Sequence, residues 1–444
     1  MNQMPPYDHH TQPNRWHGRL MRQTLGRRKI MVNGIHFESS VKDYRDSLFY
    51  KIRTAIKCCR RSLAVKLLVL LVPPALVIGC CCTGPAWAKE GARSQLERIT
   101  IVGDKPNNGF FDPSVEYGKD GIGWLAYSMV TAPKYVETHL AKSTDKGKTW
   151  SFVKVINQRS KGSVNVKKGV QEGVWRHETP TLLYDPKDIP ARRWKLFVHC
   201  YLTIPPYETE DRLFEKGWIE YKYAATPDGR WSEGIRLFGK KENKCKVDLT
   251  TLHADLKNFR HFSEPGSIAI DGTIYISMDA SVTTSGLGKW EQRKIVLFSS
   301  KDHGTTWNYV GALTDYNDAS AFGYVTMTGS SLVKESGRIF LMLSPSGAKG
   351  LFKKNRAHDG TLVVEFHDIR HAKLKRDAKE KLAVLKTFKP DLNSGGLSDY
   401  DEQNTAGGIL FSQINMPAIP EIFQIFSTKK RIVQQDAAAD AEPN

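Results

Sequence analysis

The sequence predicts an all-β protein, a five-bladed β-propeller behind an N-terminal targeting region, with a six-bladed ring as the alternative. The 444 residues include 35 Gly, 21 Pro and 10 Trp, which favours many short strands joined by turns. One turn motif recurs along the chain, and five units of about four strands follow one another, as propeller blades do. The hydrophobic fraction of 40% and the charged fraction of 25% exclude a multi-span membrane protein, a coiled coil and wholesale disorder.

Residues 1–88 indicate targeting rather than fold. The uncharged, apolar stretch at 67–82 follows several basic residues and precedes Ala86-Trp87-Ala88, which is the order of parts in a secretory signal. We expect an exported protein (periplasmic, cell-surface or secreted) that is cleaved after Ala88. Two alternatives stay open. The stretch at 67–82 is retained as a membrane anchor, or Cys80 is acylated, because Val77-Ile78-Gly79-Cys80 resembles a bacterial lipobox.

The net charge of +18 is concentrated at the N-terminus, since residues 1–88 hold 14 Lys and Arg against 4 Asp and Glu. Residues 89–444 hold 51 against 43 and show no nucleic-acid motif, so we expect no nucleic-acid partner. Outside the targeting region only Cys200 and Cys245 occur, and whether they pair is left open. No CxxC or His/Cys cluster with metal-ligand spacing is present, so we predict neither a metal nor another cofactor.

A turn motif of the form Ser-x-Asp-x-Gly-x-Thr-Trp occurs twice, at 143–150 and 300–307, with a decayed copy at 226–231. In such a turn the Asp carboxylate accepts backbone N–H bonds, Gly adopts a positive φ, and Trp packs beneath. We therefore predict a structural role for the motif residues Ser143, Asp145, Gly147, Trp150, Ser300, Asp302, Gly304 and Trp307.

The predicted propeller spans 89–433, and the Ala/Asp-rich tail at 434–444 is expected to be disordered. The leading strands of the five units are expected near positions 112, 178, 264, 326 and 406. The segment Leu96–Val102 is an extra strand, which we expect to complete the last blade and so close the ring.

The repeated turns resemble the Asp-boxes (BNR repeats) of sialidases, whose propellers have six blades, and of related exported propellers. The leading strands resemble those of the five-bladed glycoside hydrolases (arabinanases, xylosidases, invertases and fructosidases), in which blades one to three each place an acid at the axis. Asp112-Pro113, Glu178 with Pro180, and Glu264-Pro265 match that order. Blade two departs from it, because the family has Asp, often as Arg-Asp-Pro, where this chain has Arg176-His177-Glu178.

The sialidase resemblance departs further from its family. Sialidases have three arginines that grip a carboxylate and a Tyr/Glu nucleophilic pair, whereas no Arg lies between Gly103 and Met129 in this chain.

The resemblance implies roles for these acids in glycosidic cleavage, which needs a proton donor and a second carboxylate. Asp112 is expected to act as base or nucleophile and Glu264 as general acid, while Glu178 orients the sugar and raises the pKa of the acid. The expected substrate-binding residues are Trp175, Arg176, His177, His261 and Tyr324. The alternative for the acids is purely structural: Asp112 caps a turn, and the two glutamates bind backbone N–H groups at strand mouths.

The predicted function is that of an exported glycoside hydrolase-like propeller that acts on a carbohydrate. Two alternatives are kept: sialidase activity, and a non-catalytic propeller that binds glycans or proteins. The non-catalytic alternative predicts that the acids do not converge, or that no pocket closes around them.

Overall fold

In the computed structural model the described residues are 96–131, 135–167, 169–207, 212–282, 292–347, 358–390, 394–414 and 422–433. The chain divides into two units, Met1–Trp87 and Ala88–Asn444, and every described residue belongs to the second. The predicted targeting region and the tail at 434–444 lie outside the described residues. Within the described part of the chain, no helix is long and apolar enough to cross a membrane.

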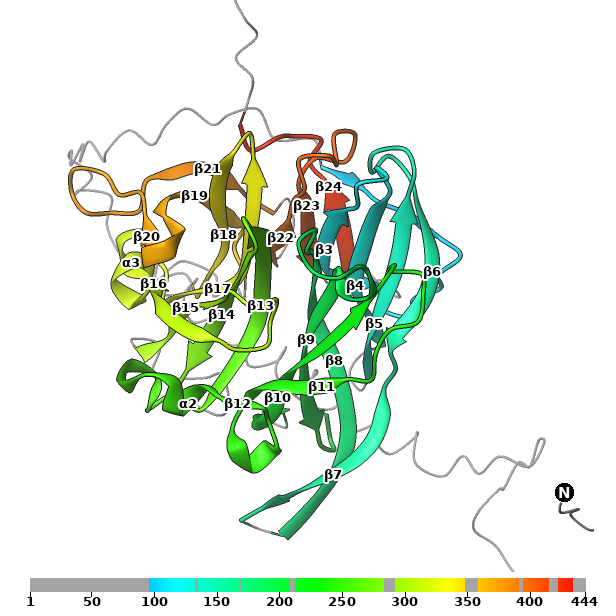
Figure 1. Ribbon diagram of the computed structural model, residues 1–444, viewed down its shortest axis with the longest axis vertical. Coiled ribbons are helices and arrows are strands. Elements are labelled where there is room, and N and C mark those ends of the chain that lie inside the picture. Colours follow the sequence, from blue (N-terminus) through cyan, green and yellow to red (C-terminus); the bar gives the residue numbers. More distant parts are fainter. Residues whose placement is uncertain are drawn as a thin grey trace, which may run out of the picture. The chain divides into compact units, whose positions relative to one another are not determined.

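The described residues form five sheets, here called sheets I to V in chain order (Figure 1). Sheet I holds, in spatial order, β2 (Ile101–Val102), β6 (Trp150–Asn157), β5 (Tyr135–Ser143), β4 (Gly123–Thr131) and β3 (Phe110–Tyr117). Sheet II holds β12 (Val247–Asp248), β11 (Ile235–Gly239), β10 (Arg212–Ala224), β9 (Trp194–Thr203), β8 (Gly169–Tyr184) and β7 (Ser160–Val166). Sheet III holds β13 (His261–Ile270), β14 (Thr273–Ser281), β15 (Lys294–Ser300) and β16 (Asn308–Thr314).

Sheets IV and V complete the set. Sheet IV holds β17 (Thr326–Glu335), β18 (Arg338–Ser346), β19 (Thr361–Asp368) and β20 (Lys373–Leu374), and β21 (Val384–Phe388) also pairs with β19. Sheet V holds β22 (Ser394–Asp399), β23 (Leu410–Ile414), β24 (Phe423–Ser427) and β1 (Glu97–Arg98). The described helices are short: α2 (Leu249–Leu252), α3 (Tyr316–Ala321) and the 3₁₀ turns Pro190–Arg192, Lys241–Asn243, Ala254–Leu256 and Ile369–His371.

The sheets form a closed ring. The innermost strands are β3, β8, β13, β17 and β22; each contacts the next, and β22 contacts β3. Apolar clusters fill the interface between each pair of neighbouring sheets, including the one between V and I, where Leu410 lies in one cluster with Leu125. Burying an aliphatic or aromatic side chain of this kind stabilises the fold by ~1.5–3 kcal/mol. The fold is the predicted β-propeller, and its apolar core lies between the sheets rather than on the axis.

The N-terminal segment joins two sheets rather than forming one strand. Glu97 pairs with Ser427, so β1 completes sheet V, as expected for a closing strand. Three residues after the end of β1, Ile101 pairs with Trp150 in parallel, and β2 thereby extends sheet I. The segment Leu96–Val102 therefore ties the last sheet to the first.

Every innermost strand carries one bulge at an equivalent position. The bulge residues have left-handed backbone and share a positive φ of 50–56°: Asp112, Thr179, Glu264, Gly329 and Leu397. The strand register shifts at each of them. In sheets I to III the following residue is Pro113, Pro180 or Pro265, which has no N–H to give to the ladder and so favours a break in pairing there.

This equivalence corrects two of the predicted leading positions. The bulge position of sheet II is Thr179, so Glu178 stands one residue before it, whereas Asp112 and Glu264 occupy the position itself. The innermost strand of sheet V is β22, so the predicted leading position 406 is wrong. Ala406 precedes β23, the second strand of that sheet, whose apolar sequence imitates a leading strand.

The repeated turns join the third and fourth strands of sheets I and III. The Ser143 hydroxyl donates to Asp145 Oδ1 (2.8 Å), and Asp145 Oδ1 accepts from Thr149 N (2.9 Å). The Ser300 hydroxyl donates to Asp302 in the same way (2.8 Å), and Trp150 and Trp307 are buried. Asp112 lies near the start of β3 and the Ser143 turn lies beside its end, so turns and axial acids occupy opposite ends of the sheets.

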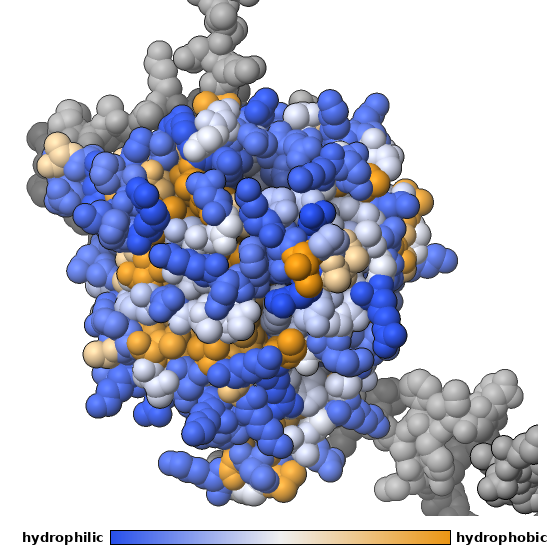
Figure 2. All heavy atoms as spheres, in the orientation of Figure 1, coloured by the Kyte–Doolittle hydropathy of each residue, from blue (hydrophilic) through white to orange (hydrophobic). Residues whose placement is uncertain are grey.

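The outer surface of the propeller is mostly polar. Figure 2 shows hydrophilic side chains over most of one face, with apolar groups in small separated areas. Among the described residues, the large hydrophobic side chains that are exposed are few and far apart in sequence: Val102, Val170, Ile189 and Leu385.

Candidate active site

Asp112 is buried at the centre of the ring. Its Oδ2 accepts hydrogen bonds from the Ser128 hydroxyl (2.7 Å) and from Thr179 N (3.2 Å) on the next inner strand. Its Oδ1 is buried and has no hydrogen-bond partner among the described residues. Burial, reinforced by the nearby charges of Glu178 and Glu264, raises the pKa of Asp112 well above its ordinary value. Burial and the neighbouring negative charges therefore both disfavour the ionised form of Asp112.

Glu178 has the opposite environment. Its Oε2 lies 3.2 Å from Arg176 Nη2 and accepts a 2.6 Å hydrogen bond from the Tyr201 hydroxyl. Burial alone would raise the pKa of Glu178, but Arg176, Arg212 and the tyrosine outweigh it, and the pKa lies below its ordinary value. Glu178 is therefore the ionised carboxylate of the group.

Glu264 lies between these extremes. Its Oε2 accepts from Gly329 N (2.6 Å), which is the bulge residue of the next sheet. Burial and then the charge of Asp279 raise the pKa of Glu264 to about 7, with Glu178 adding a smaller effect and Arg293 opposing it. The carboxyl thus exchanges its proton near neutral pH, which is the range that suits a general acid.

The three acids lie close enough for their charges to act on one another, but Asp112 and Glu264 line the central cavity and Glu178 does not. The charges of Glu178 and Glu264 act on Asp112, and all five bulge residues line one cavity of about 30 Å³. One water molecule requires a cavity of about 10–15 Å³, so this cavity admits water but not a sugar ring. The non-catalytic alternative predicted either that the acids do not converge or that no pocket closes around them. The charges of the acids act on one another, so the first condition is not met, whereas a cavity without room for a sugar ring agrees with the second.

The second strand of each sheet, counted from the axis, carries a residue that is the same in three sheets and differs in the other two. The residue paired with the position before each bulge is serine in sheets I, IV and V: Ser128, Ser344 and Ser412. Each of these hydroxyls accepts the N–H of the next sheet's bulge residue, at 2.6–3.1 Å. The equivalent residues of sheets II and III are His199 and Asp279. The two departures from serine therefore stand beside Glu178 and Glu264.

These surrounding groups were not predicted from the sequence. Asp279 is fully buried and forms an ion pair with Arg293, and burial raises the pKa of Asp279. Burial lowers the pKa of His199 to about 4, so its imidazole is neutral. Predicting both residues would have required the register between the first and second strands of each sheet. A single sequence with irregular blade lengths does not reveal that register. Arg212 is adjacent to a segment outside the described residues and carried no motif.

The predicted substrate-binding residues separate into different environments. Arg176 forms an ion pair with Glu178. His261 is buried and stacks on Phe214 (ring centroids 5.2 Å apart), which packs against Tyr201. One aromatic ring, that of Phe214, therefore separates His261 from the tyrosine that contacts Glu178.

Three residues lie elsewhere. Trp175 packs on Trp218 (4.6 Å between centroids), and His177 contacts Cys200, both in the interface between sheets I and II. Tyr324 is buried in the cluster between sheets III and IV, and its hydroxyl donates to Asp359 (2.7 Å). The structure does not bring these three side chains to the axial acids.

Comparisons with known proteins identify a fold likeness. No family model matches the chain, and no curated protein matches it. Solved structures similar to it include the Bombyx mori GH32 β-fructofuranosidase BmSUC1 (12% identity, TM-score 0.43, 75% of this chain and 61% of that chain). Others are the exo-inulinase from Aspergillus awamori (10%, 0.46, 75% and 63%) and the intramolecular trans-sialidase from Ruminococcus gnavus (13%, 0.43, 76% and 98%).

Both groups that the sequence motifs resemble, fructosidases and sialidases, are represented among these structures. The chain spans less than two thirds of the length of the fructosidase and the inulinase.

Proposed function

We propose that this protein hydrolyses glycosidic bonds at the axis of the propeller. One observation carries the proposal: three carboxyl groups from three different sheets meet there, and their surroundings push their proton affinities apart. Glycosidic hydrolysis needs one carboxyl that holds a proton and one that does not. Glu264 and Glu178 supply that pair.

The chemistry follows from these two states. Glu264 gives its proton to the departing glycosidic oxygen, so that the leaving group departs as a neutral alcohol. Glu178, ionised beside Arg176, faces the positive charge that develops on the sugar and either attacks its anomeric carbon or takes a proton from water. The small cavity between the bulges has room for the attacking water molecule. We place the sugar outside this cavity, at the end of the propeller where the inner strands begin.

The raised pKa of Asp112 changes the role that we expected from the sequence. A base or nucleophile must be ionised, and the two neighbouring acids and burial oppose ionisation of Asp112. We therefore assign the charged role to Glu178. A neutral Asp112 is a hydrogen-bond donor whose Oδ1, free of partners among the described residues, presents its proton to substrate.

Amide variants test these assignments on a panel of chromogenic glycosides. Glu264→Gln is expected to lower kcat/KM by about 10²–10⁴ on a substrate with a poor leaving group. Glu178→Gln should lower it at least as much, because Glu178 is the one acid of the three whose pKa lies below its ordinary value. Asp112→Asn should cost roughly tenfold or less, since the amide imitates a protonated carboxyl. Glu172→Gln, on the exposed part of β8, is the control.

A result in which Asp112→Asn abolishes hydrolysis and Glu178→Gln spares it would restore the assignment made from the sequence. Full activity in both Glu264→Gln and Glu178→Gln would remove the hydrolase proposal.

A second candidate, sialidase-type hydrolysis, is favoured by the contact between Tyr201 and Glu178. The hydroxyl donates to the carboxylate at 2.6 Å, as in a Tyr/Glu nucleophilic pair, and Arg176 and Arg212 act on the same carboxylate. Arg293, at the facing acid Glu264, supplies a third cation. Three arginines, Arg176, Arg212 and Arg293, thus act on the axial glutamates.

Tyr201→Phe separates the two candidates. Sialidase-type chemistry predicts loss of about 10³-fold or more in kcat on glycosides whose sugar carries a carboxylate, with no turnover of neutral ones. Hydrolysis without a tyrosine nucleophile predicts a modest loss and activity on neutral glycosides.

A further inference from the structure

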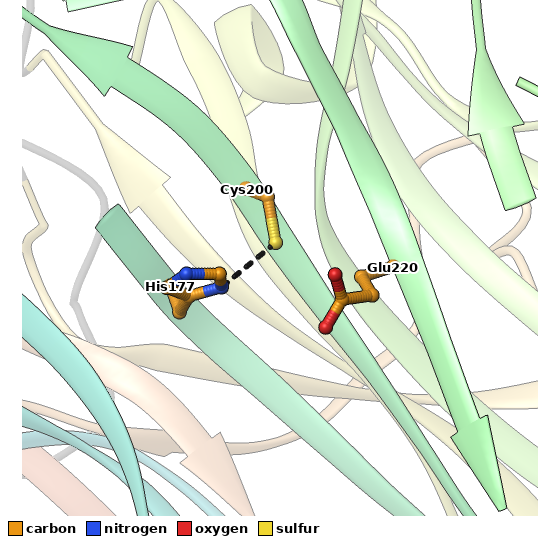
Figure 3. Close-up of side chains that lie close together, drawn as sticks. All are labelled: His177, Cys200 and Glu220. Carbon is orange, nitrogen blue, oxygen red and sulfur yellow. Dashed lines mark hydrogen bonds between the residues drawn. The ribbon is translucent and has the colours of Figure 1, made fainter. Parts of the chain in front are cut away.

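A second group of reactive side chains lies in the interface between sheets I and II. Three neighbouring strands of sheet II contribute one residue each: His177 from β8, Cys200 from β9 and Glu220 from β10. His177 pairs directly with Cys200, and Glu220 pairs with Val198, two residues away, so all three point to one face of the sheet. Figure 3 shows them turned toward one another.

The distances suit a shared ligand. His177 Nδ1 lies 3.1 Å from Cys200 Sγ, and one ligand atom from each of the three residues falls within 4.8 Å of the others. An ion bound about 2.0–2.3 Å from nitrogen, sulfur and oxygen requires ligand atoms at such separations. Since β8 bears Arg176 and Glu178 on its opposite face, the cluster is separate from the axial site.

Sheet I adds a fourth donor. Asn157, at the end of β6, is buried; its Nδ2 donates to Glu220 Oε1 (2.6 Å) and lies 3.2 Å from His177 Nδ1. Its Oδ1 is buried and accepts no hydrogen bond within the described residues. A buried amide oxygen without a partner is unusual, and rotation of this amide by half a turn exchanges its oxygen with the nitrogen that now faces the cluster.

The charge state is compatible with an ion. Burial raises the pKa of the Cys200 thiol well above its ordinary value and lowers the pKa of His177 to about 4, so the cluster without metal holds a neutral thiol and a neutral imidazole. Neutral imidazole is the form that binds metal, and a divalent ion displaces the thiol proton. Thiolate and carboxylate together then balance two positive charges.

Lys222 is the competing cation, since its Nζ lies 3.6 Å from Glu220 Oε1 and donates to the carbonyl of Ile156. Its partner Glu220 is only partly buried, which gives an ion a route to the cluster.

We propose that His177, Cys200 and Glu220, with Asn157 as fourth ligand, bind one divalent transition-metal ion of the zinc type that fastens sheet I to sheet II. The N, S and O donors favour zinc over magnesium or calcium, which take oxygen ligands. A site filled by four protein ligands is a structural one. The sequence alone did not predict this metal site, because successive ligands are 20 or more residues apart and follow no compact spacing.

Cobalt titration of the full, chelator-treated chain tests the site, since cobalt bound to thiolate gives a charge-transfer absorption. Five further cysteines precede residue 88, so the informative quantity is the difference between wild type and Cys200→Ser, in which their contribution cancels. The site predicts that wild type and the control Cys245→Ser each show one equivalent of cobalt more than Cys200→Ser, with the matching absorption. Cys245 is the other free thiol in the described part of the chain.

Thermal unfolding gives a second reading, independent of hydrolysis and of the N-terminal cysteines. Zinc should raise the Tm of wild type and of Cys245→Ser by several degrees and leave Cys200→Ser unchanged, because an ion that binds only the folded state stabilises it. If Cys200→Ser does not fold, Glu220→Gln replaces it and should weaken zinc binding at least tenfold. Equal cobalt spectra in wild type and variant, or no zinc-dependent rise in Tm, would overturn the proposal.

Discussion

At the scale of single residues, the candidate active site holds three carboxyl groups whose pKa values are shifted in different directions. Asp112 and Glu264 sit in the same kind of bulge, and each accepts a backbone N–H from the next sheet. Glu178 differs because it precedes its bulge and reaches Arg176 and Tyr201. One residue of offset along β8 therefore separates a carboxyl whose pKa is lowered from two whose pKa values are raised.

The pH dependence of hydrolysis should report Glu264. Its pKa of about 7 means that the protonated fraction falls tenfold for each pH unit above that value. We expect kcat/KM to decline above about pH 7 with unit slope, and the residual activity of Glu264→Gln to lack this decline. A profile that stays flat to pH 9 in the wild type would contradict the assignment of the acid.

Asp279 should set the position of that decline. Its charge is the largest contribution, after burial, to the raised pKa of Glu264. Asp279→Asn should therefore move the alkaline limb of kcat/KM toward lower pH, while Asp271→Asn, in the exposed turn after β13, should leave it in place. A merely structural Asp279 would reduce the amount of folded protein without shifting the limb.

At the scale of strands and turns, the repeated Ser-x-Asp turns are predicted to stabilise rather than to react. Asp302 accepts hydrogen bonds from Thr306 N (2.8 Å) and the Thr306 hydroxyl (2.6 Å), and these lower the pKa of Asp302 to about 2.

Asp302→Ala should lower the free energy of unfolding by about 1–2 kcal/mol in urea titrations and leave kcat unchanged. Lys301→Ala, on the exposed neighbour, is the matched control and should change stability by less than about 0.5 kcal/mol. A large fall in kcat for Asp302→Ala would place the turn in the site instead.

The sequence predicts the strands and turns better than it predicts which positions of different sheets are equivalent. The X-Pro pairs at Asp112 and Glu264 mark the bulges of sheets I and III correctly, because proline interrupts a ladder wherever it falls. Sheets IV and V have serine after the bulge, at Ser330 and Ser398, and no such mark. The sequence therefore predicts the leading strand of sheet V in the more apolar segment that follows Ser394–Asp399, and not in Ser394–Asp399 itself.

The surroundings of the acids were harder to predict than the acids. His199, Asp279 and Arg293 reach the axis through pairing between strands, and a single sequence does not specify that register. Trp175 and His177 were expected at the site because they neighbour Glu178 in sequence. Side chains alternate along a strand, so such neighbours face the other side.

At the scale of the whole molecule, stability lies in the interfaces between sheets. Phe298 is fully buried between sheets II and III, with its ring centroid 5.8 Å from that of Phe238. Phe298→Ala should cost about 3–5 kcal/mol of unfolding free energy. Because the sheets form a closed ring, we expect one transition that is the same for fluorescence and circular dichroism. Val102→Ala, at an exposed position, should have little effect.

Two separate transitions in Phe298→Ala would show that neighbouring sheets unfold independently, which a closed ring does not allow.

The most direct test of the axial trio is the titration of Glu264 by carbon NMR of side-chain-labelled protein, assigned by the signal lost in Glu264→Gln. Convergence of buried acids predicts a midpoint near pH 7 that moves downward in Asp279→Asn. A midpoint near 4.5, where an isolated glutamate titrates, would show that the carboxyls do not share a buried site and would remove the basis for hydrolysis.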